Sequence, residues 1–267
     1  MQFWILFAVA MVVSAIGWKK FVWFISLGYG FSMAAIGVAL LFLFAPAAAA
    51  RGDVASLLIC AMLVVYGLRL GGYLAYRERR SAAYNHVMKT QVNDGSGISK
   101  PVQALIWATC ALLYACEASP VLWRLANGCG LDAFGVAGVC VMALGIVLES
   151  ASDLQKSAQK RVNPHRFCDK GLFSFVRCPN YLGEVLTWTG MLVSGLGAAS
   201  GAWQWAAMLF GWVGIVYVMF GGARRLEIRQ NKNYGADPEY QAYVRRTPIL
   251  LPFVPLYSVE KYTWLKG

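Results

Sequence analysis

The chain reads Gly171-Leu-Phe-Ser-Phe-Val-Arg-Cys-Pro-Asn-Tyr-Leu-Gly-Glu-Val-Leu-Thr-Trp-Thr-Gly190 where a basic, turn-rich segment meets an apolar run. Asn180, Tyr181 and Glu184 fall at the start of that run. We therefore expect these three side chains at a membrane surface, where a transmembrane helix begins. Polar side chains at that depth are costly and usually serve a function. This junction is the first candidate site.

The composition places the whole chain in a membrane. Hydrophobic residues make up 58% of the sequence and charged residues only 14%, whereas about 25% charged residues is usual in soluble domains. We predict an all-α, polytopic protein that forms a single integral membrane domain over residues 1–267. Its seven transmembrane helices are expected at residues 2–17, 21–46, 54–75, 102–118, 132–150, 181–198 and 203–222.

Basic residues lie almost entirely on one side of this topology. Of the 24 Lys and Arg residues, 21 follow the odd-numbered predicted spans, whereas Arg51 and Arg124 lie in alternate loops and Arg69 lies within a span. The positive-inside rule then predicts that the N-terminus is outside and the C-terminus is cytoplasmic. The net charge of +11 fits this topology and attraction to anionic lipid, or an anionic ligand such as a nucleotide phosphate. Nucleic-acid binding is not expected, because the basic residues are divided among four regions beside lipid.

The cysteine and histidine residues give no support for a metal site. The seven Cys include no Cys-x-x-Cys pair, and the only His residues are His86 and His165. Buried free thiols that pack as small apolar groups are the expected state of the cysteines. No His, Cys and carboxylate residues have metal-ligand spacing, so we expect no metal.

A series of Tyr and Arg residues runs along the third predicted span. Tyr66, Arg69, Tyr73, Arg77 and Arg80 recur at spacings of three and four, which places them on one helix face. Such a face could line a cleft that opens to the cytoplasm, or it could be an interfacial anchor of aromatic and basic residues. We favour the cleft, because Arg69 lies deep for a simple anchor.

Acidic residues near the opening stretch leave two interpretations open. Glu184 could pair with a nearby Arg for structure or could contact a ligand. Glu149 and Asp153 could be ordinary charges at a helix end or could bind ligand hydroxyls. We expect the fifth span to continue as a helix past Asp153 until Asn163-Pro164 stops it. The tail is expected to hold a second short helix at 239–246.

Motifs around the opening stretch are similar to the C-terminal part of the steroid 5-alpha-reductase family, and most similar to its bacterial branch of membrane proteins. The strong resemblance covers about residues 149–253, and a weaker one covers the Tyr and Arg face of the third span. The residues that carry the strong resemblance are Asp153-Leu-Gln-Lys, Arg166, Gly171-Leu-Phe, Arg177-Cys-Pro-Asn-Tyr-Leu-Gly-Glu184, Trp188, Gly190 and Tyr234-Gly-Ala-Asp-Pro-Glu-Tyr-Gln-Ala-Tyr.

The resemblance implies an NADPH-dependent oxidoreductase in the bacterial inner membrane, with its active site facing the cytoplasm. Its substrate would be a steroid-like or other lipid with a C=C conjugated to a carbonyl. Tyr66 would be the catalytic acid, which stabilises the charge that develops on the carbonyl oxygen. Residues 151–267 would be the cofactor-binding region after five spans in residues 1–150. Residues implied to contact NADPH are Arg69, Tyr73, Arg80, Asp153, Lys160, Arg161, Arg166, Asn180, Tyr181 and Glu184, with Arg224, Arg225 or Arg229 closing over the phosphates.

The chain departs from the family pattern at two places. Steroid reductases pair the Tyr with a Glu on the second span, whereas residues 21–46 contain no acidic residue. This departure argues against a 3-keto steroid as substrate and leaves the NADPH expectation unchanged. The bacterial branch usually has His where this chain has Cys178, a position to which the resemblance assigns no chemistry.

Two rival functions remain open. Isoprenylcysteine and phospholipid methyltransferases share a similar segment and use S-adenosylmethionine. Asn180 and Glu184 favour the reductase, and the basic residues suit a phosphorylated dinucleotide better than a cationic sulfonium. The third class is a non-enzymatic membrane protein that kept the fold, for which the missing acidic residue on the second span is the best support.

Overall fold

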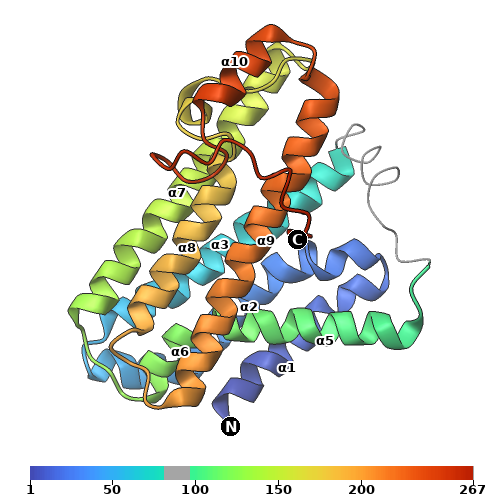
Figure 1. Cartoon of the computed structure of the whole chain (residues 1–267). Helices are drawn as coiled ribbons and strands as arrows, with labels where there is room; N and C mark the ends of the chain where they lie inside the picture. The colour runs from blue at the N-terminus through green and yellow to red at the C-terminus, as the bar shows by residue number, and fades with distance from the viewer. Residues whose placement is uncertain (81–96, 267) are drawn as a thin grey trace. The chain divides into compact units, whose positions relative to one another are not determined.

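All regular elements of the described residues are helices (Figure 1). The computed structural model describes residues 1–80 and 97–266, and within them the prediction of an all-α chain is confirmed. The α-helices are α1 (Gln2–Ser14), α2 (Leu27–Ala50), α3 (Val54–Arg80), α5 (Lys100–Glu117), α6 (Ser119–Ala126), α7 (Ala133–Val162), α8 (Pro179–Gly195), α9 (Ala202–Tyr234) and α10 (Pro238–Arg246), and the short 3₁₀ helices are η1 (Ala15–Trp18), η2 (Phe21–Phe24) and η3 (Gly171–Ser174).

Four helices are long and apolar enough to cross a membrane. They are α2 together with η2, α3, α7 and α9, and the bent pair of α5 and α6 raises the number to five if it counts as one span. The helices on the other two predicted spans are shorter: α1 has 13 residues and α8 has 17, whereas a bilayer needs about 20. The four or five long apolar helices make the chain a polytopic membrane protein. The count of seven spans stays a prediction, because it needs α1 and α8 to cross the membrane as well.

Close contacts divide the chain into two compact units, which we describe separately. Unit 1 comprises Met1–Val139 and Met191–Trp212, and unit 2 comprises Cys140–Gly190 and Val213–Gly267. The single integral membrane domain over residues 1–267 stays a prediction.

Glycine residues bring α2 and α3 of unit 1 into close contact. A Cβ atom on Gly67 would lie 2.4 Å from the backbone nitrogen of Ala34, and one on Gly30 would lie 2.7 Å from that of Gly71. The two helices can therefore approach at backbone distance only because these positions lack side chains. This contact fixes the register between α2 and α3.

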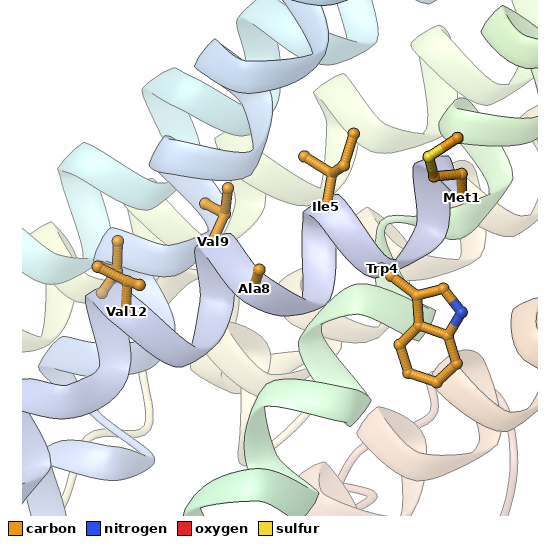
Figure 2. Close-up of a pocket in the computed structure, with 7 residues that line it drawn as sticks. Met1, Trp4, Ile5, Ala8, Val9 and Val12 are labelled. Atoms are coloured by element: carbon orange, nitrogen blue, oxygen red, sulfur yellow. The ribbon is translucent and has the colours of Figure 1, made fainter.

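Helix α1 presents an apolar surface. A shallow groove of about 520 Å³ runs along it, and Figure 2 shows its side chains side by side on one face of the helix. Exposed apolar side chains also occur on the long helices, for example Phe42 of α2 and Val147 of α7. Contiguous apolar surface of this kind marks contact with lipid or another apolar partner. The lining residues of the groove are Met1, Trp4, Ile5, Ala8, Val9, Val12 and Val13.

Unit 2 is built on the close packing of α7 and α8. A Cβ on Gly145 would lie 2.4 Å from the backbone nitrogen of Thr187, and one on Gly183 would lie 2.6 Å from that of Glu149. Helix α7 continues to Val162 and ends before Asn163-Pro164, as predicted. Both the long helix and its stop therefore follow from the sequence.

An aromatic cluster joins α10 to the segment between α7 and α8. Phe167 stacks on Tyr243 with 5.5 Å between ring centroids, and the Tyr243 hydroxyl donates to the carbonyl oxygen of Phe173 at 2.7 Å. Burial raises the pKa of the Tyr243 hydroxyl, so this group remains a donor. The predicted short helix of the tail is present as α10.

Candidate functional site

Tyr66 of α3 lies fully buried beside a second phenol. Its hydroxyl donates to the hydroxyl of Tyr29 of α2 at 3.1 Å, and the two rings meet edge to face at 6.3 Å. The ring of Tyr29 in turn packs on Tyr114 of α5, with 5.1 Å between centroids. The Tyr114 hydroxyl donates to the carbonyl oxygen of Phe24 at 2.7 Å. Three helices of unit 1 therefore surround a buried pair of hydroxyl groups.

The remaining candidate residues of α3 become more exposed toward the end of the helix. Arg69 and Tyr73 are half-buried, and Arg80 is exposed. The Arg77 guanidinium lies 5.5 Å from the ring centroid of Tyr73, which is cation–π distance. The predicted face is thus continuous from a buried phenol to an exposed guanidinium.

A separate group forms where α7 ends in unit 2. The Lys160 ammonium donates to the carbonyl oxygens of Pro164 and Arg166 at 3.1 and 2.6 Å, and to the Tyr234 hydroxyl at 3.1 Å. Lys160 therefore orders the turn after α7 and ties it to the end of α9. A ligand phosphate would have to compete with these contacts.

Arg166 is engaged in the same group. It contacts Glu239 of α10 at 2.7 Å and Asp169 at 3.0 Å. The hydrogen bonds that Arg166 donates to Glu239 and Asp169 raise the pKa of its guanidinium. Arg166 thus links α10 to the turn, a contact that sequence reasoning did not anticipate.

The junction between the basic, turn-rich segment and the apolar run lies at the start of α8. Asn180 and Tyr181 are half-buried in its first turn, and the Tyr181 ring lies against Gly222 of α9, where a Cβ would be 3.4 Å away. Glu184 is buried and accepts a hydrogen bond from the Trp188 indole at 3.1 Å. The junction therefore combines an accessible amide and phenol with a carboxylate held inside unit 2.

Cys178 precedes this helix and is chemically inert. Its side chain is fully buried, and burial raises the pKa of the thiol to about 12. A thiol in this state is a poor nucleophile near neutral pH. Cys178 is therefore a packing residue.

The other candidate residues of unit 2 lie on α7 and α9. Asp153 is half-buried on α7, and Arg161 is exposed near its end. Arg224 donates from Nε to the carbonyl oxygen of Glu260 at 2.9 Å. Arg225 and Arg229 are exposed on α9.

The candidate residues thus fall into two sets. Tyr66, Arg69, Tyr73 and Arg80 belong to unit 1, whereas the other ten belong to unit 2. Within unit 2, Lys160 and Arg166 are brought together at the end of α7. Asn180, Tyr181 and Glu184 share the start of α8.

Sequence reasoning missed the buried Tyr29, and it left Glu149 open between an ordinary helix-end charge and a ligand contact. Tyr29 is the hydroxyl partner of Tyr66, and a tyrosine among the small residues of the second span was the available signal. Glu149 is only 4% exposed within α7 and packs on Gly183. Its position in an apolar helix could have added it to the candidate residues, because a buried carboxylate there is costly.

The helices and buried polar groups define an integral membrane protein with polar clusters within its helices. The family profile described as "Protein of unknown function (DUF1295)" matches residues 9–247, and the chain belongs to this family. Neither the comparison with curated proteins nor the comparison with solved structures gave a match. The family match includes every candidate residue and ends before residue 248.

Proposed function

We propose that the chain is an NADPH-dependent reductase that transfers a hydride to an activated C=C bond of a hydrophobic lipid. The observation that carries the proposal is the buried hydroxyl pair of Tyr66 and Tyr29. A phenol held in apolar surroundings suits a proton donor aimed at a developing oxyanion. The family is associated with steroid 5-alpha-reductase-like membrane proteins, which supports the same chemistry.

The second phenol supplies what the missing acidic residue would have supplied. A hydroxyl group can rotate its hydrogen between partners. If Tyr66 turns its O–H toward a substrate carbonyl, Tyr29 can donate to the Tyr66 oxygen and stabilise charge there. With NADPH bound to supply a hydride to the β-carbon, Tyr66 would stabilise the enolate oxygen by its hydrogen bond, and a proton from solvent would complete the reduction at the α-carbon. Because neither phenol carries a charge, this pair suits a neutral enone lipid.

The residues present fit a phosphorylated dinucleotide. Arg225 and Arg229 are exposed cations on α9, and the Asn180 amide is half-buried at the start of α8. Guanidinium groups bind phosphate oxygens in a bidentate geometry. Within unit 2 we assign phosphate contacts to the α9 arginines, and orientation of the cofactor to Asn180. When bound, NADPH supplies the hydride.

We propose in addition a number of spans and a side of the membrane for each terminus. Seven spans, an outside N-terminus and a cytoplasmic C-terminus would place the basic ends of α3, α7 and α9 on the cytoplasmic side. The protein would then lie in a bacterial inner membrane with its active site facing the cytoplasm, where NADPH is available. The basic loop positions support this orientation.

The first test is ligand-dependent thermal stabilisation of the purified protein by NADPH, NADH and S-adenosylmethionine in parallel. A ligand at 100 times its Kd should stabilise the folded protein by about 2.7 kcal/mol. We expect a response to NADPH. A response to S-adenosylmethionine alone would replace the proposal with a methyltransferase, and a response to none of the three from folded protein would favour a non-enzymatic role.

Single substitutions, each with a matched control, test the residues assigned to NADPH binding and to catalysis. Asn180→Ala and Arg69→Ala should each abolish the NADPH response while the protein stays folded, and unchanged affinity in both would contradict the site. Arg79→Ala is the control for Arg69, because Arg79 is exposed on the same helix. Tyr66→Phe should bind NADPH but fail to reduce an enone lipid. Its control is Tyr76→Phe, which changes an exposed tyrosine of α3.

A further inference from the structure

The last residues of the chain form an extended strap that the family match does not include. We define the C-terminal strap as residues 248–266, which follow the matched range of 9–247. It begins beside the start of α8, where the backbone nitrogens of Arg177 and Cys178 donate to the carbonyl oxygens of Pro248 and Ile249 at 2.9 and 3.0 Å. The strap is therefore attached to unit 2 from its first residues.

Contacts with α9 fix the direction of the strap. The Glu227 carboxylate accepts from the backbone nitrogen of Val259 at 2.8 Å, and Arg224 donates to the carbonyl oxygen of Glu260 at 2.9 Å. Farther along the strap, the Tyr217 hydroxyl donates to the carbonyl oxygen of Trp264 at 2.8 Å. Later residues of the strap thus contact earlier residues of α9, so the strap runs antiparallel to the helix.

This register sets the depth of Trp264. Arg224 is the first charged residue of α9, and the helix before it is apolar. Tyr217 lies seven residues earlier, which corresponds to about 10 Å along the helix toward its apolar part. Trp264 stacks on Tyr217 with 6.2 Å between ring centroids and is 62% exposed. The exposed indole therefore lies beside the part of α9 that is suited to lipid.

The strap also displays a second aromatic side chain at a strained position. Phe253 has φ of 64° and is 96% exposed. Pro252 and Pro255 flank it, and a hydrogen bond of 2.9 Å from the Ile249 nitrogen to the Leu256 carbonyl oxygen closes the loop. Positive φ is rare and costly for a bulky residue, and it persists only where the surrounding structure holds the residue in place. Here it presents an aromatic ring outward.

We propose that the C-terminal strap is a membrane-interface anchor that places Trp264 and Phe253 in the interfacial layer of the bilayer. Tryptophan is enriched at that depth because one end of its ring is apolar and the other donates a hydrogen bond. Lys261 and Lys266 lie in the same strap and suit anionic lipid headgroups. The inference is independent of the proposed reductase activity.

The test measures which environment surrounds Trp264. The full chain is reconstituted in nanodiscs of phosphatidylcholine and phosphatidylglycerol, with or without brominated phosphatidylcholine, and aqueous iodide is the second quencher. The emission of Trp264 is the difference between wild type and Trp264→Phe. We expect brominated lipid to quench this component and iodide to leave it largely unquenched.

Two further variants calibrate the measurement. Trp203→Phe isolates an exposed indole at the other end of α9, and Trp188→Phe isolates one that is 2% exposed. Trp264 should behave as Trp203 does. Quenching of Trp264 by iodide alone would place the strap in water and overturn the proposal. Quenching by neither agent, as expected for Trp188, would show that protein covers the strap, which also overturns it and points to a second copy of the chain.

Discussion

Two fully buried arginines, one in each unit, use their guanidinium groups differently. Arg124 of unit 1 uses all three nitrogens, whereas Arg177 of unit 2 uses only Nη2 for its ion pair with Glu227 at 2.7 Å and its contact with the Tyr257 carbonyl oxygen. Nε and Nη1 of Arg177 make no hydrogen bond of good geometry in the described part of the chain, although the guanidinium also interacts with the Tyr240 hydroxyl. The partners of Arg124 are Ser56, Asp53, Asp132 and the carbonyl oxygens of Gly130 and Ser194.

This difference shows that burial alone does not reveal what an arginine does. A buried ion pair offsets its desolvation only when further hydrogen bonds satisfy the remaining groups. Arg124 meets that condition and ties together the turns and helix ends of unit 1. Arg177 meets it in part, and its contacts fasten the C-terminal strap.

Removal of Arg124 should have the largest effect on stability. Arg124→Ala leaves the fully buried Asp53 without its cation, so we expect a loss of about 3–5 kcal/mol in the free energy of unfolding. Chemical unfolding of the detergent-solubilised protein measures it. Arg51→Ala is the control, because Arg51 is exposed. Equal stabilities of the two variants would show that the Arg124 network is not structural.

Glu227→Gln should have a smaller effect. The amide retains one acceptor for Arg177 or Val259 but loses the charge that both donors now share, and hydrogen bonds to charged groups contribute about 1.5–3 kcal/mol. We expect the free energy of unfolding to fall by an amount near the lower end of this range, and trypsin to cleave faster at Lys261. Glu260→Gln is the control, because Glu260 is exposed. Unchanged cleavage in Glu227→Gln would show that the ion pair between Arg177 and Glu227 does not hold the C-terminal strap in place.

Lysine substitutions sharpen the comparison. Arg177→Lys keeps a cation that can reach the two acceptors now bound by one nitrogen, so we expect a loss of about 1 kcal/mol. Arg124→Lys cannot reproduce contacts made by three nitrogens and should lose at least twice as much stability. The same unfolding assay compares the two variants, and similar losses would contradict the difference in geometry.

The smallest effect concerns the pH dependence of the Arg124 network. Burial alone would raise the pKa of Asp132, but hydrogen bonds from Gly135 and Arg124 outweigh it and lower the pKa below 3.8. The ionised Asp132 carboxylate therefore contributes its full stabilisation above the pKa that Asp132 has in the unfolded chain. This stabilisation is lost as pH falls through the lower pKa of Asp132 in the folded protein. Wild type should be more stable than Asp132→Asn at neutral pH, and the gap should narrow below about pH 4. A gap that does not change with pH would contradict the shift.

Local signals in the sequence predicted much of the fold. Asn163-Pro164 stops α7 because proline cannot continue a helix, and the residues of α10 follow a turn that ends at Pro238. The bend of 52° between α5 and α6 was not predicted, although Pro120 marks the start of α6. The C-terminal strap was also missed, because its contacts are between residues far apart in sequence and it has no periodicity.

The site could be predicted only in part, for a related reason. Spacing placed Tyr66 and Arg69 on one face of α3, and the apolar run after Asn180 placed Glu184 at the start of a helix, where its side chain is buried. Partners are set by packing and are not visible in spacing. The Tyr29 partner of Tyr66 and the contact of Arg166 with Glu239 therefore required the structure.

The glycine contact between α2 and α3 also bears on how the protein is made. The two helices are joined by only the short turn 51–53, and their contact surface lies within residues that leave the ribosome before α7, α8 and α9. N-terminal segments of a growing chain can associate before later segments are synthesised. This helical hairpin, with Tyr29 already beside Tyr66, can thus assemble in the membrane before α7, α8 and α9 exist.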